Sequence, residues 1–214
     1  MPENAKFNKF SVPLGLLDYV NPIFYTITMV AIIKATYAAM GTPCNVILLI
    51  GAIISILFGF VIPTGKVLVG LGIIKFVMPV PLVACVNTGI LISGLMLFDY
   101  VLGLDMGVLL GLVALIVVLL VCLYIKTKKP NTIAVLTGAF GYLLIYASLI
   151  VLAARWHMPM EIALYAIAIL LFIMLCGIGI KADLKNPKVH WVIEISNVVC
   201  QFLVALSTVM LFSV

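Results

Sequence analysis

Residues 106–125 read MGVLLGLVALIVVLLVCLYI, twenty consecutive residues without a charged side chain. As an α-helix, about twenty residues extend about 30 Å, which matches the hydrocarbon core of a lipid bilayer. The next six residues, KTKKPN at 126–131, bring three lysines and a proline, so the apolar helix is expected to end there. This stretch therefore predicts a membrane-spanning helix.

The whole chain has a composition that a soluble protein does not have. Of its 214 residues, 66% are hydrophobic and 9% are charged, and the mean hydropathy is +1.39. Soluble domains carry about 25% charged residues, so lipid is expected to be the solvent of this chain. The net charge of +5 is not gathered in one stripe, which argues against a nucleic-acid partner and fits loops that face an anionic inner leaflet.

Short polar breaks divide the chain into seven predicted spans. The expected fold class is an all-α, polytopic transmembrane helical bundle. We expect residues 1–19 to form a cytoplasmic or interfacial N-terminal segment, with residues 10–17 on the membrane surface, and residues 20–214 to form one transmembrane domain. Without an uninterrupted apolar core or a small-residue cleavage site, the N-terminus does not read as a signal peptide. The predicted spans are residues 20–40, 45–62, 67–98, 106–125, 132–154, 162–180 and 191–213.

The third predicted span is unusually long. Residues 67–98 would make a straight helix of about 48 Å, whereas two crossings would need about forty residues and a turn. We therefore predict a single long helix, kinked at Pro79 and Pro81.

The distribution of charge predicts the orientation. With seven spans, one side receives Arg155 as its only basic residue. Under the positive-inside rule the opposite, lysine-rich side is cytoplasmic, which gives N-in and C-out. The expected location is a cell membrane of the bacterial cytoplasmic type. The lysines on the cytoplasmic side are Lys6, Lys9, Lys66, Lys126, Lys128, Lys129, Lys181, Lys185 and Lys188.

The cysteines and histidines give no sign of a metal site or a cofactor. The five cysteines are scattered, four of them inside apolar runs, and no CxxC or Cys/His spacing occurs. We interpret them as small hydrophobic side chains. Nucleotide-binding and hydrolase motifs are also missing, so no cofactor and no metal are predicted.

Two charged residues inside the predicted spans are candidates for a site. Charges in the membrane are costly and usually functional. Lys75 lies about 12 Å into the third span, four residues before Pro79, whose ring cannot bond the carbonyl of residue 75. Lys75 either borders a polar pocket or extends to the lipid phosphates. Glu194 begins the last span, in the same half of the bilayer, so we predict that it pairs or shares a site with Lys75.

A polar stripe runs along the last span. Glu194, Asn197, Gln201 and Thr208 lie at offsets of 0, 3, 7 and 14 residues, within roughly 60° of the helix circumference. Lipid cannot satisfy such a stripe, so it must face the bundle or a cavity. It is either a hydrogen-bonded seam between helices or the wall of a site, with Glu194 as acid, base or cation partner and Asn197 and Gln201 as binding residues.

The fifth predicted span carries small and aromatic residues. Gly138 and Gly141 would allow close helix packing. Tyr142 and Tyr146 are one turn apart and are candidates for the border of a cavity, although tyrosines bonded to nearby backbone are commoner.

Three short motifs are shared with a known family: Asn21-Pro22, Ser55-Ile56-Leu57 leading to Phe58-Gly59, and Gln201-Phe202-Leu203-Val204. With these residues, the stretch from about residue 20 to residue 212 resembles the YhhN-like family, which includes lysoplasmalogenases, membrane enzymes that cleave the vinyl-ether bond of lysoplasmalogens. It implies a lipid-handling helical bundle. The family's acidic positions fall at Gly59 and around Cys176-Gly177, so its two-carboxylate chemistry is not implied.

Three functions remain open at the level of sequence. The first is a YhhN-like protein that binds or acts on a lipid-like amphiphile; as an enzyme it would be a hydrolase with Glu194 as general acid or base. The second is a small transporter or a substrate-capturing transport subunit. The third is a non-catalytic partner or scaffold. Membrane lipid is the expected partner, and the sequence does not indicate an oligomeric state.

Overall fold

The computed structural model describes residues 12–74, 80–181 and 187–213. Over these residues the chain forms eight α-helices and no strand. The helices are α1 (Val12–Asp18), α2 (Val20–Thr36), α3 (Thr42–Gly70), α4 (Val80–Leu102), α5 (Met106–Thr127), α6 (Pro130–Arg155), α7 (Pro159–Lys181) and α8 (Pro187–Leu211).

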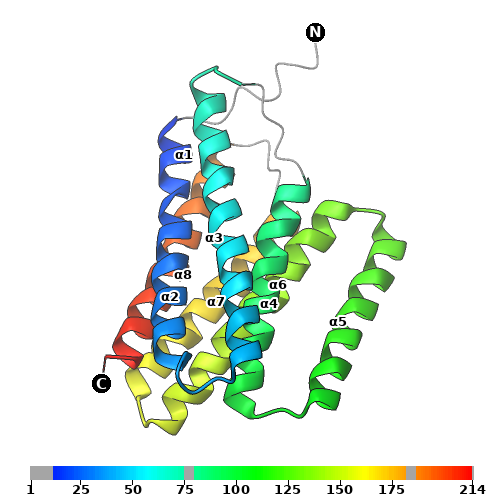
Figure 1. The fold of residues 1–214 in the computed structure, drawn as a ribbon. Coiled ribbons are helices and arrows are strands. Elements are labelled where there is room, and N and C mark those ends of the chain that lie inside the picture. The colour runs from blue at the N-terminus through cyan, green and yellow to red at the C-terminus, as the bar shows by residue number, and fades with distance from the viewer. Residues whose placement is uncertain (1–11, 75–79, 182–186, 214) are drawn as a thin grey trace.

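The predicted all-α bundle of seven spans is confirmed. Seven described segments are long and apolar enough to cross a membrane, with mean hydropathies from 1.5 to 3.3. The first of them, Val12–Thr36, combines α1 and α2. The helices alternate in direction, so α3 and α5 end, and α6 and α8 begin, at the upper end of the bundle in Figure 1. The ends of α3 and α5, which carry Lys66 and Lys126, therefore lie on one side, whereas Lys34 lies in the last turn of α2, toward the opposite side.

Helix α4 lies between α3 and α6, and glycines bring these three helices into close contact. A Cβ atom at Gly89 would lie 2.6 Å from the carbonyl oxygen of Gly51, and one at Gly94 would lie 2.5 Å from that of Gly141. Only glycine permits such an approach of two helix backbones. The predicted packing role of Gly138 and Gly141 is therefore confirmed, since a Cβ at either would collide with α4.

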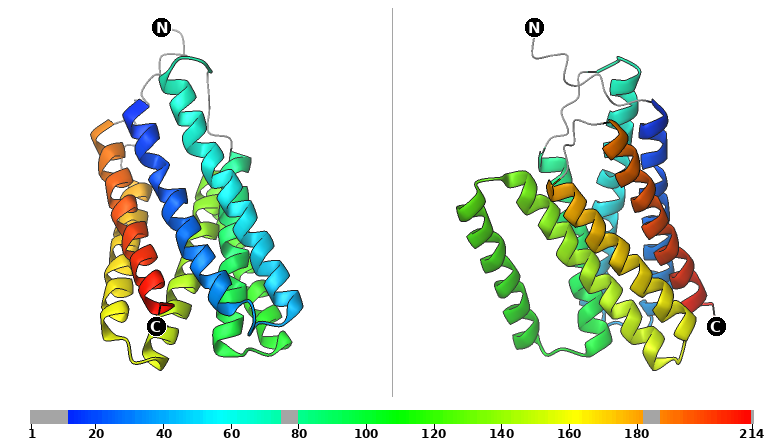
Figure 2. Two further views of the ribbon diagram at one scale, coloured as in Figure 1. Left: turned by 60° about the vertical axis from the view of Figure 1, so that its left-hand side comes forward. Right: turned by 180° about the vertical axis from the view of Figure 1, so that it is seen from behind.

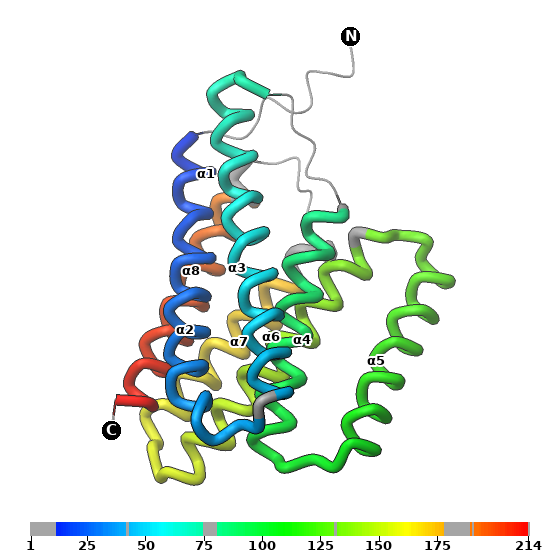
Figure 3. Tube along the Cα trace, in the orientation of Figure 1, coloured from blue at the N-terminus to red at the C-terminus, as the bar shows by residue number. Residues whose placement is uncertain are grey.

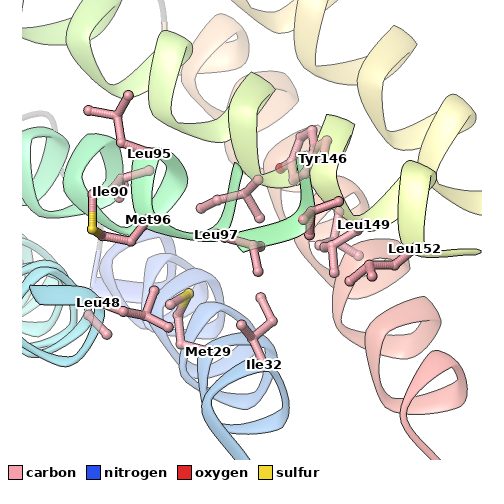
Figure 4. Packing of buried hydrophobic residues seen from close by; sticks show 14 of the residues in the cluster. Met29, Ile32, Leu48, Ile90, Leu95, Met96, Leu97, Tyr146, Leu149 and Leu152 are labelled. Carbon is pink, nitrogen blue, oxygen red and sulfur yellow. The ribbon is translucent and has the colours of Figure 1, made fainter. Parts of the chain in front are cut away.

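Buried apolar side chains of α2, α3, α4 and α6 fill the space around this centre. Figure 4 shows part of the cluster, in which Met29 and Ile32 from α2 face Leu97 from α4 and Leu149 from α6. All four are at most 1% exposed, so the middle of the bundle is closely packed over this region.

Helix α5 stands apart from the rest (Figures 1 and 2). Among the described helices it packs mainly against α6, and its buried residues are Leu109 and Ile116. Its remaining surface is almost wholly aliphatic and exposed. An exposed aliphatic surface of this kind suits contact with lipid.

The predicted boundary between the second and third spans is wrong. Helix α3 does not end near residue 62 but continues through Pro63 to Gly70, and α4 begins at Val80. The single kinked helix over residues 67–98 therefore does not form, and the third span is the shorter Pro81–Leu102. Proline is tolerated inside a membrane helix because neighbouring groups satisfy the freed carbonyl. Of the two prolines predicted to kink that helix, Pro81 lies in the first turn of α4, and Pro79 lies outside the described residues.

The described part of the predicted interfacial segment, residues 12–18, forms α1 and packs against α3 and α8. Leu14, Gly15 and Asp18 are buried there. Pro22 has no N–H to donate to the carbonyl of Asp18, so one helix hydrogen bond is missing between α1 and α2, while the backbone of Tyr19 keeps helical angles. Figure 3 shows that α1 nevertheless leads into α2 along one column.

Candidate functional site

A buried ionic cluster joins three helices at the lysine-rich end of the bundle. The Nζ atom of Lys66 on α3 lies 2.7 Å from Oδ2 of Asp18 on α1 and 2.8 Å from Oε1 of Glu194 on α8. The side chains of Lys66, Asp18 and Glu194 are 8%, 13% and 10% exposed. We call these three residues the ion triad. Buried charges are retained only where they are paired and hydrogen-bonded, and the triad meets this condition.

Asn21 completes the hydrogen bonding between the two carboxylates. Its Nδ2 atom donates to Oδ1 of Asp18 at 3.2 Å and to Oε2 of Glu194 at 3.4 Å. Its Oδ1 atom is buried and has no hydrogen-bond partner among the described residues. Asn21 lies three residues after Asp18, and Tyr19 between them has helical backbone angles (φ −63°, ψ −24°), so the helical spacing places both side chains on one face, beside Glu194.

The ion triad adjoins a cavity of about 170 Å³ inside the bundle. Asp18 is the triad member that lines it. The wall contributed by α3 and α4 is mainly apolar, whereas α2, α6 and α8 add amide and hydroxyl groups. The lining residues are Asp18, Asn21, Pro22, Tyr25, Ser55, Gly59, Ile62, Val86, Ile90, Tyr142 and Asn197.

Two tyrosines form an aromatic wall of this cavity. The rings of Tyr25 and Tyr142 meet edge to face with centroids 6.1 Å apart. The hydroxyl of Tyr25 lies 3.1 Å from Oγ of Ser55, and that Oγ also donates to the carbonyl of Gly51 at 2.9 Å. The aromatic wall is therefore anchored to α3 by hydrogen bonds.

The polar stripe of the last span faces the bundle, as predicted. Glu194, Gln201 and Thr208 are buried, and Asn197 lines the cavity. The stripe is nevertheless divided along its length. Gln201 interacts with the hydroxyl of Tyr142, whereas Thr208 bonds Tyr165 at 3.0 Å and belongs to a seam between α7 and α8.

The two tyrosines of the fifth predicted span have different surroundings. Tyr142 lines the cavity. Tyr146, one turn further, does not, and is fully enclosed beside Cys200, with its hydroxyl 3.9 Å from the cysteine Sγ. Its ring packs edge to face on Phe172. Tyr142 therefore remains a candidate ligand-binding residue because it lines the cavity, whereas Tyr146 packs in the interface between α6, α7 and α8.

Lys75, the predicted partner of Glu194, lies outside the described residues. In the structure Glu194 binds a different lysine, because Oε1 contacts Lys66 and Oε2 contacts Asn21. Glu194 is also not among the residues that line the cavity. Its position is that of a partner within the triad, next to the cavity rather than in its wall.

Four residues that the structure places at the site were not identified from the sequence: Lys66, Asp18, Asn21 and Tyr25. Lys66 follows Pro63-Thr64-Gly65, which is typical of a helix end, so it was assigned to a loop. One signal was available: the eight residues after Lys66, VLVGLGII, are all apolar or glycine. A lysine between two apolar runs is better interpreted as a residue within a membrane helix.

These features define an integral, multi-pass membrane protein with a polar cavity next to a buried ion triad. No group of three or more potential metal ligands occurs among the described residues. Comparison of the chain with known protein families, with curated proteins and with solved structures gave no match.

Proposed function

We propose that this membrane protein binds an amphiphile, with the polar head of the ligand in the cavity between α2, α3, α4, α6 and α8. The observation that carries the proposal is the composition of the cavity. Apolar side chains such as Ile62, Val86 and Ile90 form one part of the lining, and Asp18, Asn21 and Asn197 form another. Mainly apolar pockets with a few placed polar groups are typical of ligand sites.

The size of the cavity sets the part of a ligand that it holds. A cavity of about 150 Å³ can hold a molecule of the size of benzene, and this one has about 170 Å³. It therefore accommodates a head group or a short segment, and an acyl chain would extend beyond it between the helices. This proposal agrees with the lipid handling that the resemblance to the YhhN-like family implies.

Filling the cavity tests the proposal. A Cβ atom at Gly59 would meet only Cβ of Pro22, at 3.4 Å, an ordinary contact, so Gly59→Leu extends its side chain into the cavity without a backbone collision. Gly111→Leu on α5 is the matched control, because a Cβ there meets nothing within 4 Å.

Native mass spectrometry of the purified protein should show a retained amphiphile in the parent and in Gly111→Leu, and a loss of at least about tenfold in Gly59→Leu, since the leucine occupies the head-group space. Equal retention in all three contradicts the proposal.

If the bound amphiphile is also cleaved, Asp18 rather than Glu194 is the carboxylate placed to act as general acid or base, because Asp18 lines the cavity. Incubation with a lysoplasmalogen and measurement of aldehyde release tests this reaction. Absence of release, under conditions in which a known lysoplasmalogenase is active, would remove the hydrolase and leave the binding proposal intact.

Transport is a second candidate, favoured by the missing helix hydrogen bonds at the cavity. Pro22 cannot donate to the carbonyl of Asp18, and Pro63 cannot donate to the carbonyl of Gly59 in α3. Both Asp18 and Gly59 line the cavity, and backbone carbonyls freed within membrane helices at a central site are typical of transporters. Proteoliposomes should then take up the retained molecule with the parent protein and not with Gly59→Leu. Uptake equal to that of empty liposomes would exclude transport.

A further inference from the structure

The described lining of the cavity carries charge of one sign only, which is negative. Of the described residues that line it, Asp18 is the only one with an ionisable carboxylate or ammonium group, and it is acidic. Asp18 shares the Lys66 ammonium with Glu194, so the described triad contains two carboxylates and one ammonium. Among the described residues, an entering positive charge would therefore approach a carboxylate that shares its one ammonium with a second carboxylate, which is favourable where water is scarce.

A second group next to Asp18, the side-chain amide oxygen of Asn21, can also accept a hydrogen bond from a ligand. Both carboxylates receive hydrogen bonds from Nδ2 of Asn21, which fixes the orientation of its amide. The remaining atom, Oδ1, is a buried acceptor without a partner among the described residues. Buried acceptors are rarely left unsatisfied. Because Asn21 lines the cavity, an N–H donor bound there would satisfy Oδ1 once the Asn21 side chain turns this atom toward the cavity.

The aromatic wall fits the same chemistry. The rings of Tyr25 and Tyr142 both line the cavity and meet edge to face. Ring faces attract a cation, and aromatic walls combined with a carboxylate are a common way to bind an ammonium group. A metal ion fits less well, because no cluster of three potential metal ligands occurs among the described residues and much of the lining is apolar.

We propose that the cavity binds a protonated amine. Its ammonium group displaces Lys66 as the ion-pair partner of Asp18 and donates a hydrogen bond to Oδ1 of Asn21. The ammonium belongs either to the head group of a lipid or to a free amine; the lipid source rests on the function proposed above. Lys66, at 2.7 Å from Asp18, is then an internal competitor of the ligand. This role is opposite to that of a lysine that recognises a phosphate.

Three small probes of matched size and different charge test the ligand class. Benzylamine, benzyl alcohol and benzoate are titrated into purified protein in a neutral detergent, with binding followed by tyrosine fluorescence and thermal shift. We expect benzylamine to bind at least about tenfold more tightly than the other two, because only it carries an ammonium. Preference for benzoate, or equal binding of the three probes, would overturn the proposal.

Two variants test the roles of the triad. Asp18→Asn should weaken benzylamine at least about tenfold, since it removes the carboxylate that contacts the ligand. The double variant Lys66→Met with Glu194→Gln removes the competitor while the triad keeps its net charge, and it should strengthen benzylamine about tenfold. Within the triad, Asp18→Asn leaves the Lys66–Glu194 ion pair, and the double variant leaves Asp18 as the one charged group. Circular dichroism and size-exclusion chromatography verify that both variants fold. Unchanged benzylamine affinity in folded Asp18→Asn, or weaker binding by the double variant, is incompatible with the proposed site.

Lipid probes distinguish the source of the amine and separate the two proposals. Lysophosphatidylethanolamine and lysophosphatidylglycerol are compared in the same assay. Selective binding of the ethanolamine lipid, lost in Asp18→Asn, supports both proposals. Benzylamine binding without either lipid supports the amine site and contradicts the amphiphile. Equal binding of both lipids, insensitive to Asp18→Asn, supports the amphiphile and overturns the amine site.

Discussion

At the scale of single residues, the ion triad has an uneven composition that decides how each substitution acts. Lys66 is the only ammonium among its three side chains, whereas Asp18 and Glu194 both bind it. Removal of one carboxylate leaves a matched pair. Removal of the lysine leaves two carboxylates close to each other with their shared ammonium lost. The three positions are therefore not equivalent, although all three are buried.

We predict that Lys66→Met destabilises the protein by about 3–5 kcal/mol, the usual cost of an uncompensated buried charge. Asp18→Asn and Glu194→Gln should each cost clearly less, because a pair remains. Thermal unfolding in detergent measures the order. Lys126→Met, at an exposed position in the last turn of α5, is the control and should leave the melting temperature nearly unchanged. The prediction fails if Lys66→Met is the mildest of the three triad substitutions.

At the scale of elements, α4 owes its central place to glycines on two of its faces. Gly89 faces the backbone of α3, and Gly94 faces that of α6. Both contacts are between backbones, so flexible side chains cannot move aside to make room. The position of the cavity depends on this packing, since α3, α4 and α6 all contribute to its lining.

Gly94→Ala should therefore destabilise the bundle by about 1–3 kcal/mol, because its Cβ would lie 2.5 Å from the carbonyl oxygen of Gly141. Gly111→Ala is the matched change on α5, where a Cβ meets nothing within 4 Å. Alanine favours a helix over glycine, so this control should be neutral or slightly stabilising. Melting temperatures of the two variants check the contrast, and equal values would show that α4 and α6 are not in backbone contact.

At the scale of the whole molecule, the alternation of the helices sets which ends share a side of the membrane. The ends of α3 and α5 that carry Lys66 and Lys126 lie on the same side of the bundle (Figure 1). The positive-inside rule assigns this side to the cytoplasm, and the opposite side contains the start of α5.

Cysteine labelling of intact bacterial cells tests this orientation. Met106→Cys, at an exposed site at the start of α5, should react with a membrane-impermeant thiol reagent. Lys129→Cys, between α5 and α6, should react only after the membrane is broken. The unmodified chain, with its own five cysteines, provides the baseline. The reverse pattern would place the N-terminus and the ion triad on the outside.

The sequence was sufficient for features that depend on local composition. The uninterrupted apolar run at 106–125 matches α5 within two residues, Met106–Thr127, and the periodicity of the last span placed Glu194 and Gln201 inside the bundle. The triad depends instead on partners far apart in the chain, with Lys66 and Glu194 separated by 128 residues. The apolar residues on both sides of Lys66 indicate a helix there, but no local pattern shows which side chains pair with it, because Asp18 comes from α1 and Glu194 from α8.

The separation of the triad along the chain has a consequence for biosynthesis. Spans emerge from the ribosome in order, so Asp18 and Lys66 enter the membrane well before Glu194. An early intermediate can pair them one to one, as a neutral couple suited to lipid surroundings. The second carboxylate arrives with α8, which is made after the other described helices, and only then does the ammonium bridge α1, α3 and α8. Insertion of α8 thus converts a balanced local pair into a shared, negatively biased centre, and a nascent chain truncated before α8 lacks that centre.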